Sequence, residues 1–217
     1  MPRKPTQSSA RKSNEERPKP KINLNQTRLT VDLSYRNIDN LNTTVAAQVK
    51  PRNCSNAAKL DEGSSQYDAG ILKMNNNSIN SLTGLDEFVR KILVSPESLT
   101  WLDLSFNQLQ KLDGTLSSLP SLTILYLHGN ELQSLSDVLK ILQPLPKLTH
   151  LTLNGRNPFQ IRSPHYRPKV IISLTTLISL DFVSITTWER QLAQDKAHSV
   201  TIAKQTLKKK PIRHYYI

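Results

Sequence analysis

The chain has few of the sequence features that form disulfides, span a membrane or direct secretion. Its 217 residues include one cysteine, Cys54, and no apolar run long enough to cross a membrane. One thiol cannot form an internal disulfide, so the composition favours a reducing, intracellular compartment. The segment after Met1 lacks the charged and then apolar pattern of a signal peptide, so none is expected. The glycosylation motifs at Asn42, Asn53 and Asn76 are accordingly expected to be chance matches.

Groups that carry catalysis or metal binding are also sparse. The five histidines, at 128, 150, 165, 198 and 214, do not recur at helical or strand spacing with carboxylates or with the cysteine. None of the six glycines belongs to a phosphate-binding loop pattern. Ser105 has no histidine and acid at a spacing typical of a catalytic triad, and Asp103 has no obvious second carboxylate. We therefore expect no enzyme activity, no metal site, no cofactor and no small-molecule substrate.

The chain is rich in leucines that recur at a fixed spacing. The frame Leu-x-x-Leu-x-Leu-x-x-Asn-x-Leu occupies residues 99–109 and 122–132 without a mismatch. It returns at 148–158, where Arg156 is inserted and moves the asparagine to position 157. Residues 72–79 keep the frame with Met74 at a leucine position, and residues 31–38 keep only its apolar positions. The spacing matches the leucine-rich repeat signature.

The frame has a physical explanation. In Leu-x-Leu, a short strand turns both leucines to one face, and the asparagine amide meets backbone groups that a tight bend leaves unpaired. One repeat cannot bury its leucines alone, so neighbouring repeats must stack. Apolar residues at helical spacing in 85–93 and 135–142 predict helices on the side opposite the strands. The predicted fold is an α/β leucine-rich repeat solenoid with a short parallel sheet on its concave face, about five repeats and a C-terminal cap.

The segment after the last repeat carries a more specific resemblance. Tyr166-Arg167, Val170-Ile171 and Leu180-Asp181 resemble the C-terminal cap of intracellular leucine-rich repeats of about 22 residues. That group includes a protein phosphatase regulator and a spliceosomal snRNP protein. Residues 101–107, 125–130, 151–155 and 180–182 are similar to a group of small leucine-rich repeat proteins of cilium-bearing eukaryotes, with the likeness spanning roughly 29–190. The resemblance implies a protein-binding role in ciliated cells.

The chain divides by composition and charge. Residues 1–27 predict a basic, Pro/Ser-rich extended tail, with seven Lys and Arg against two Glu. A repeat domain is expected over 28–186, with a loop excursion at 42–68 and the cap at 160–186. A capping box at Thr186 and Glu189 predicts a helix to about Gln205, inside a C-terminal region 187–217 that ends in a basic tail. Much of the net charge of +12 therefore belongs to the two ends.

Residues that flank the inward leucines predict the binding surface, because they point to the concave face of the sheet. Nine candidates are Ile71, Lys73, Trp101, Asp103, Ile124, Tyr126, His128, His150 and Thr152. Trp101 is the expected anchor, since an exposed tryptophan among apolar neighbours is typical of a binding hot spot. The alternative is that the N-terminal tail or the 42–68 excursion folds back and covers this row.

Three functions remain open from the sequence. The favoured one is a structural adaptor of the ciliary axoneme in the cytoplasm, with tubulin or other axonemal proteins as partners and basic tails along an acidic lattice. The second is a cytosolic regulator of one protein, such as a phosphatase. The third, a ribonucleoprotein component, is disfavoured because aromatic residues do not interleave with the N-terminal basic cluster. The expected tail contacts are Arg3, Lys4, Arg11, Lys12, Lys19, Lys21, Lys208, Lys209, Lys210 and Arg213.

Overall fold

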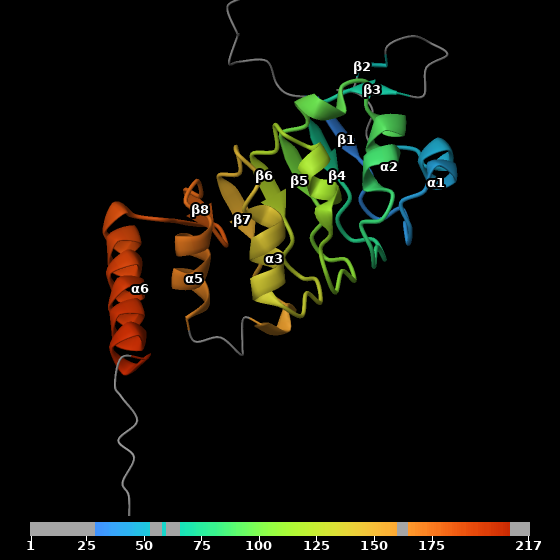
Figure 1. Cartoon of the computed structure of the whole chain (residues 1–217). Coiled ribbons are helices and arrows are strands. Elements are labelled where there is room, and N and C mark those ends of the chain that lie inside the picture. The colour runs from blue at the N-terminus through green and yellow to red at the C-terminus, as the bar shows by residue number, and fades with distance from the viewer. Residues whose placement is uncertain (1–28, 53–57, 60–65, 160–164, 209–217) are drawn as a thin grey trace, which may run out of the picture.

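A single curved sheet runs through the whole array (Figure 1). The computed structural model describes residues 29–52, 58–59, 66–159 and 165–208. The sheet has the order β1-β4-β5-β6-β7-β8-β9, and all its neighbours are parallel except the last pair. Its strands are β1 (Thr30–Asp32), β4 (Ile71–Lys73), β5 (Trp101–Asp103), β6 (Ile124–Tyr126), β7 (His150–Thr152), β8 (Ser179–Leu180) and β9 (Val183–Ser184). The predicted α/β leucine-rich repeat fold is confirmed.

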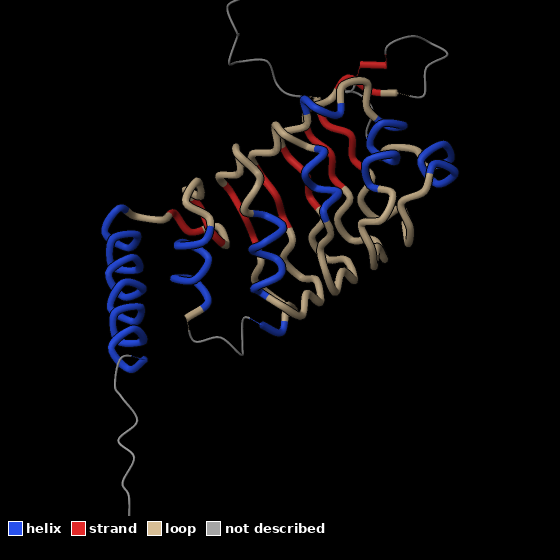
Figure 2. The backbone as a smooth tube through the Cα atoms, in the orientation of Figure 1, coloured by secondary structure: helices blue, strands red, loops and turns tan. Residues whose placement is uncertain are grey.

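Helices form the opposite, convex side of the sheet (Figure 2). They are α1 (Thr43–Gln48), α2 (Leu85–Ile92), α3 (Leu135–Leu142) and α5 (Tyr166–Ser173), with 3-10 turns η1 (Pro96–Ser98) and η2 (Gly114–Ser118). Both helices predicted from apolar spacing are present as α2 and α3. The shortest crossing, from Leu102 to Leu125, uses only η2, whereas the crossings on either side of it contain the helices α2 and α3.

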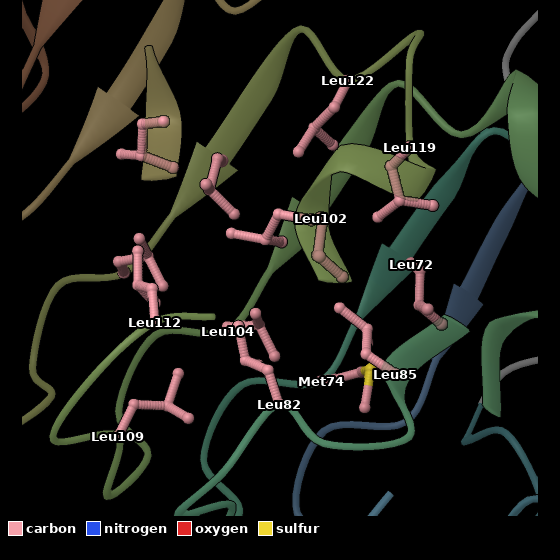
Figure 3. Packing of buried hydrophobic residues seen from close by; sticks show 14 of the residues in the cluster. Leu72, Met74, Leu82, Leu85, Leu102, Leu104, Leu109, Leu112, Leu119 and Leu122 are labelled. Carbon is pink, nitrogen blue, oxygen red and sulfur yellow. The ribbon is translucent and has the colours of Figure 1, made fainter. Parts of the chain in front are cut away.

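The repeat leucines pack between the strands and the convex elements (Figure 3). Leu72, Leu102, Leu125 and Leu151 lie opposite one another in register and are buried. Figure 3 shows Leu82, Leu85 and Leu119 turned toward the same interior from the convex side, with Met74 among them. Truncating one such leucine to alanine typically costs about 2–5 kcal/mol.

Asparagines hold neighbouring repeats together through a ladder of buried hydrogen bonds. Leu109 N donates to Asn130 Oδ1 at 3.0 Å, and Asn130 Nδ2 donates to the carbonyls of Leu104 and Leu127 at 3.0 and 2.9 Å. Asn77, Asn107 and Asn157 make equivalent bonds. Asn157 keeps its place because the inserted Arg156 lies exposed in a wider turn. The insertion therefore changes the turn and preserves the ladder.

The expectation of a loop over 42–68 was wrong at residues 43–48, which form α1. Asn42 caps this helix by accepting a hydrogen bond from Val45 N at 2.8 Å, and α1 packs beside α2. Farther on, β2 (Ala58–Lys59) pairs with β3 (Tyr67–Asp68) in antiparallel fashion. Between them and α1, Arg52 N donates to Asp32 O at 2.7 Å, so the chain returns along the free edge of β1.

The C-terminal end of the array is closed by side chains in place of a further repeat. Asp181 Oδ1 accepts from Leu153 N and Asn154 N at 2.7 and 2.9 Å, and its Oδ2 accepts from the Tyr166 hydroxyl at 2.9 Å. In the repeats before it, a strand carbonyl occupies the equivalent position, as when Leu127 N donates to Thr152 O. The Asp181 carboxylate, directly after the short strand β8, thus takes the place of a strand carbonyl.

A long helix, α6 (Thr187–Lys208), stands beside α5 at this end (Figure 1). Glu189 N donates to Thr186 Oγ1 at 3.1 Å, as the capping box predicts, and the helix runs three residues past the predicted Gln205. Arg167 fixes its start, with Nε 2.6 Å and Nη2 3.1 Å from the two carboxylate oxygens of Glu189. Among the described segments, no helix has the length and apolarity needed to cross a bilayer.

Candidate protein-binding surface on the concave face

The four central strands bring the sequence-predicted surface residues together in two rows. Strand register aligns Ile71, Trp101, Ile124 and His150 in one row, and Lys73, Asp103, Tyr126 and Thr152 in the next. His128 follows β6 in the turn beyond the second row. All nine lie at least partly exposed except Thr152, which is only 2% exposed. Thr152 was therefore wrongly predicted as a contact, because its hydroxyl is bonded at 2.7 Å to Nδ1 of His128 beneath the surface.

Trp101 is half-buried, in contrast to the exposed position expected of it. The Tyr126 ring meets it edge-on with centroids 5.4 Å apart, and the Lys73 ammonium lies 5.6 Å from its centroid. Its indole Nε1 is buried and has no hydrogen-bond partner among the described residues. The covering side chains come from the neighbouring strands β4 and β6. Trp101 is thus part of the packing of this face as well as part of its surface.

Five rings form one aromatic cluster on this face, namely Trp101, Phe106, Tyr126, His128 and Phe182. Successive pairs meet edge to face with centroids 5.0 to 5.9 Å apart. Phe182 joins the cluster from the β8–β9 turn, so the C-terminal cap contributes to the surface. Phe106 and Phe182 are its most accessible members, 51% and 61% exposed. Neither was predicted from the sequence.

Both exposed phenylalanines have left-handed backbones. Phe106 has a φ of 54° and Phe182 a φ of 65°, in a region that costs a non-glycine residue on the order of 1–3 kcal/mol. At the repeat position of Phe106, the next repeat has Gly129, and a Cβ on Gly129 would lie 2.6 Å from the Phe106 ring. The chain therefore exposes two large rings on left-handed backbones; at the position of Phe106 the other repeats have Tyr35, Asn76, Gly129 and Gly155.

Burial and nearby negative charge both shift the pKa values of the two titratable rings in the cluster, His128 and Tyr126. Burial lowers the pKa of His128, while the negative charges of Asp103 and Asp181 act in the opposite direction. Burial also raises the pKa of Tyr126, and Asp103 adds to that rise. His128 is thus favoured as a neutral ring at neutral pH, bonded to Thr152 and packed against phenylalanine. Asp103 is thus close enough to interact electrostatically with both Tyr126 and His128.

The remaining predicted features have less support from geometry. The basic tail residues at 3–21, 209, 210 and 213 lie outside the described residues, and Lys208 ends α6 with its side chain undescribed. His150 lies on β7 and His128 in the turn after the adjacent strand β6, yet the described part of the chain holds no group of three metal-ligating residues. The described parts of the excursion contact the β1 edge and the end of α2.

Comparisons with known proteins agree with the repeat frame and the cap. A family model described as leucine-rich repeat matches residues 27–210. Human leucine-rich repeat-containing protein 51 is 40% identical over 123 residues, which are 57% of this chain and 62% of the human protein. The rat protein is 33% identical over 164 residues, 76% of this chain and 82% of the rat protein. The narrower resemblance noted in the sequence is to this same protein and is confirmed.

A solved structure supports the fold independently. A chain in the crystal structure of the Drosophila melanogaster SNF/U2A′ complex superposes with a TM-score of 0.53 at 22% identity. The match covers 81% of this chain and 87% of the other. Identity at this level is evidence for the shared architecture and leaves partners to be argued from this chain's own surface.

Proposed function

Because the chain belongs to the leucine-rich repeat family, we propose that it binds another protein through its concave face, with the aromatic cluster as the anchor. One observation carries the proposal. Phe106 and Phe182 expose large rings to water on left-handed backbones. Both the backbone conformation and the exposure of an apolar ring lower the stability of the folded chain. Burying both rings against a partner would offset that cost, and aromatic residues are enriched at interface hot spots.

Serine substitutions test the proposal without disturbing the core. Phe106→Ser combined with Phe182→Ser removes the exposed rings, and we expect at least a tenfold loss of partner affinity. Tyr35→Ser is the matched control, because Tyr35 is 61% exposed at the corresponding turn, with a φ of 56°, and lies outside the aromatic cluster. Partner retention in pull-downs with the full chain is the readout. Equal retention by both variants would remove the cluster from the binding surface.

We further propose that the chain is a component of the ciliary axoneme, with tubulin or another axonemal protein as the partner. The distribution of charge supports this, because each end of the chain carries an excess of lysine and arginine while residues 28–190 are nearly balanced. Basic segments are attracted to acidic polymer surfaces, and several weak contacts in one chain raise the affinity of the whole.

Extraction of ciliated cells distinguishes this assembly from the alternative of a cytosolic regulator. A tagged full chain should remain with detergent- and salt-washed axonemes, and removal of residues 1–27 should loosen it. Substituting Lys208, Lys209 and Lys210 by glutamine provides a matched loss of charge at the other end. A chain released by detergent alone would favour the regulator, which would keep the concave face as its functional surface.

A further inference from the structure

Among the described residues, an aspartate without an ion pair lies next to the aromatic cluster. Strand register places Asp103 between Lys73 on one neighbouring strand and Tyr126 on the other. Its Oδ1 accepts from Ser105 N at 3.0 Å and from Ser105 Oγ at 2.6 Å. Within the described residues, the ion pairs join Lys140 to Asp137 and Arg167 to Glu189, so the Asp103 carboxylate has no cationic partner.

Lys73 makes a cation–π contact with a ring of the aromatic cluster. Its ammonium lies over the Trp101 ring, 5.6 Å from the centroid, and forms no ion pair with Asp103 on the adjacent strand. The faces of electron-rich rings attract cations, tryptophan most strongly. A half-exposed face with ring faces and an unpaired carboxylate is complementary to positive charge.

We propose that the partner inserts a cationic side chain, preferentially an arginine, against Asp103 and the rings of Trp101 and Tyr126. Arginine fits better than lysine because its planar guanidinium stacks on a ring while its N–H groups donate to a carboxylate. The inference rests on the proposed function and adds the chemistry of the partner. The ligand of this face is therefore a segment with a basic residue flanked by apolar ones, which cover Phe106 and Phe182.

A matched pair of substitutions isolates the charge of Asp103. Asp103→Asn keeps the acceptor for Ser105 and removes the negative charge. Asp32→Asn is the control, because Asp32 Oδ1 accepts from Ser34 N and Oγ at 2.9 and 2.5 Å in the same local turn of the first repeat. The rings of the aromatic cluster lie on β5 and β6, in the turns beyond them and in the β8–β9 turn, so only the first substitution changes the charge beside them.

The probe is a peptide that alternates arginine with glycine, and its control replaces arginine by citrulline, which has the same shape without the charge. We expect the arginine peptide to shift the Trp101 indole resonance of the isotope-labelled full chain, and the citrulline peptide to leave it unchanged. Asp103→Asn should lower the affinity for the arginine peptide by about tenfold, and Asp32→Asn should leave that affinity unchanged. Equal shifts with both peptides, no shift with arginine, or unchanged affinity in Asp103→Asn would each overturn the inference.

The two proposals fail separately. If the double serine variant loses its protein partner while Asp103→Asn retains full affinity, the concave face binds a partner without a cation contact. If the double serine variant retains the partner, the anchor itself is wrong, and a response to the arginine peptide would be a property of Trp101 and Asp103 alone.

Discussion

Replacing Asn130 by alanine tests whether the asparagine ladder stabilises the stacking of repeats. Asn130 is fully buried and takes part in three hydrogen bonds, two with the repeat before and one within its own repeat. Alanine leaves the Leu109 N–H without its acceptor, at a cost of about 1–3 kcal/mol. Two carbonyls also lose a donor, at about 0.5–1.5 kcal/mol each. The expected loss of unfolding free energy is about 2–6 kcal/mol.

A control and a graded comparison accompany that substitution. Asn154→Ala removes an asparagine with a half-exposed side chain outside the ladder, and should change stability by less than about 0.5 kcal/mol. Asn77→Ala should fall between the two, because Asn77 is in the ladder at a position that water partly reaches.

Urea unfolding followed by circular dichroism measures these free energies, and thermal melts give a second readout. For a chain of this length, the loss at Asn130 corresponds to a fall in Tm of about 4–24 °C. The reasoning would be refuted if Asn130→Ala and Asn154→Ala destabilised the protein equally, since the buried hydrogen bonds would then contribute nothing beyond an exposed amide.

Three further predictions concern the turns and the cap. Gly84→Ala should cost more than about 1 kcal/mol in urea unfolding, because the φ of 84° suits glycine and a Cβ would lie 2.3 Å from the Leu41 carbonyl oxygen; no change would contradict this. The hydrogen bond from Arg167 lowers the pKa of Glu189, so the pair's stabilisation should be present above the ordinary glutamate pKa and be lost as pH falls through the folded value. The stability difference from Glu189→Gln should therefore vanish in acid, and a difference that persists there would oppose the account. Trp188→Ser should leave the Tm within about 2 °C, because the side chain is 72% exposed, and a larger fall would reveal packing that its exposure does not suggest.

The periodic part of the fold was predictable because each repeat applies the same constraint. Leucines at strand spacing must turn inward, and an asparagine after them meets the same backbone groups in every copy. The ladder tolerated the insertion of Arg156, since the extra residue is exposed in the turn. The helix at 43–48 was missed because fewer than two turns of helix carry too little periodicity to distinguish them from a loop.

The aromatic cluster was only partly predictable. Strand phase places Trp101 and Tyr126 on the concave face, but it gives no information about how far Lys73 reaches over its neighbour. Phe106 and Phe182 lie in turns, where direction depends on a left-handed backbone that no hydrophobic period encodes. Phe182 also reaches the cluster from the cap, about fifty residues beyond its ring neighbours in the chain. That contact depends on the way β8 and β9 close the sheet.

Site-specific photo-cross-linking tests the central claim most directly. The photoreactive residue p-benzoylphenylalanine would be placed at position 106, at 182, and at Lys91, an exposed residue of α2 on the convex side. In ciliated cells, we expect the same protein to be cross-linked from positions 106 and 182 and not from position 91. Cross-linking of that protein from position 91 alone, or from all three positions equally, would contradict a partner held on the concave aromatic cluster.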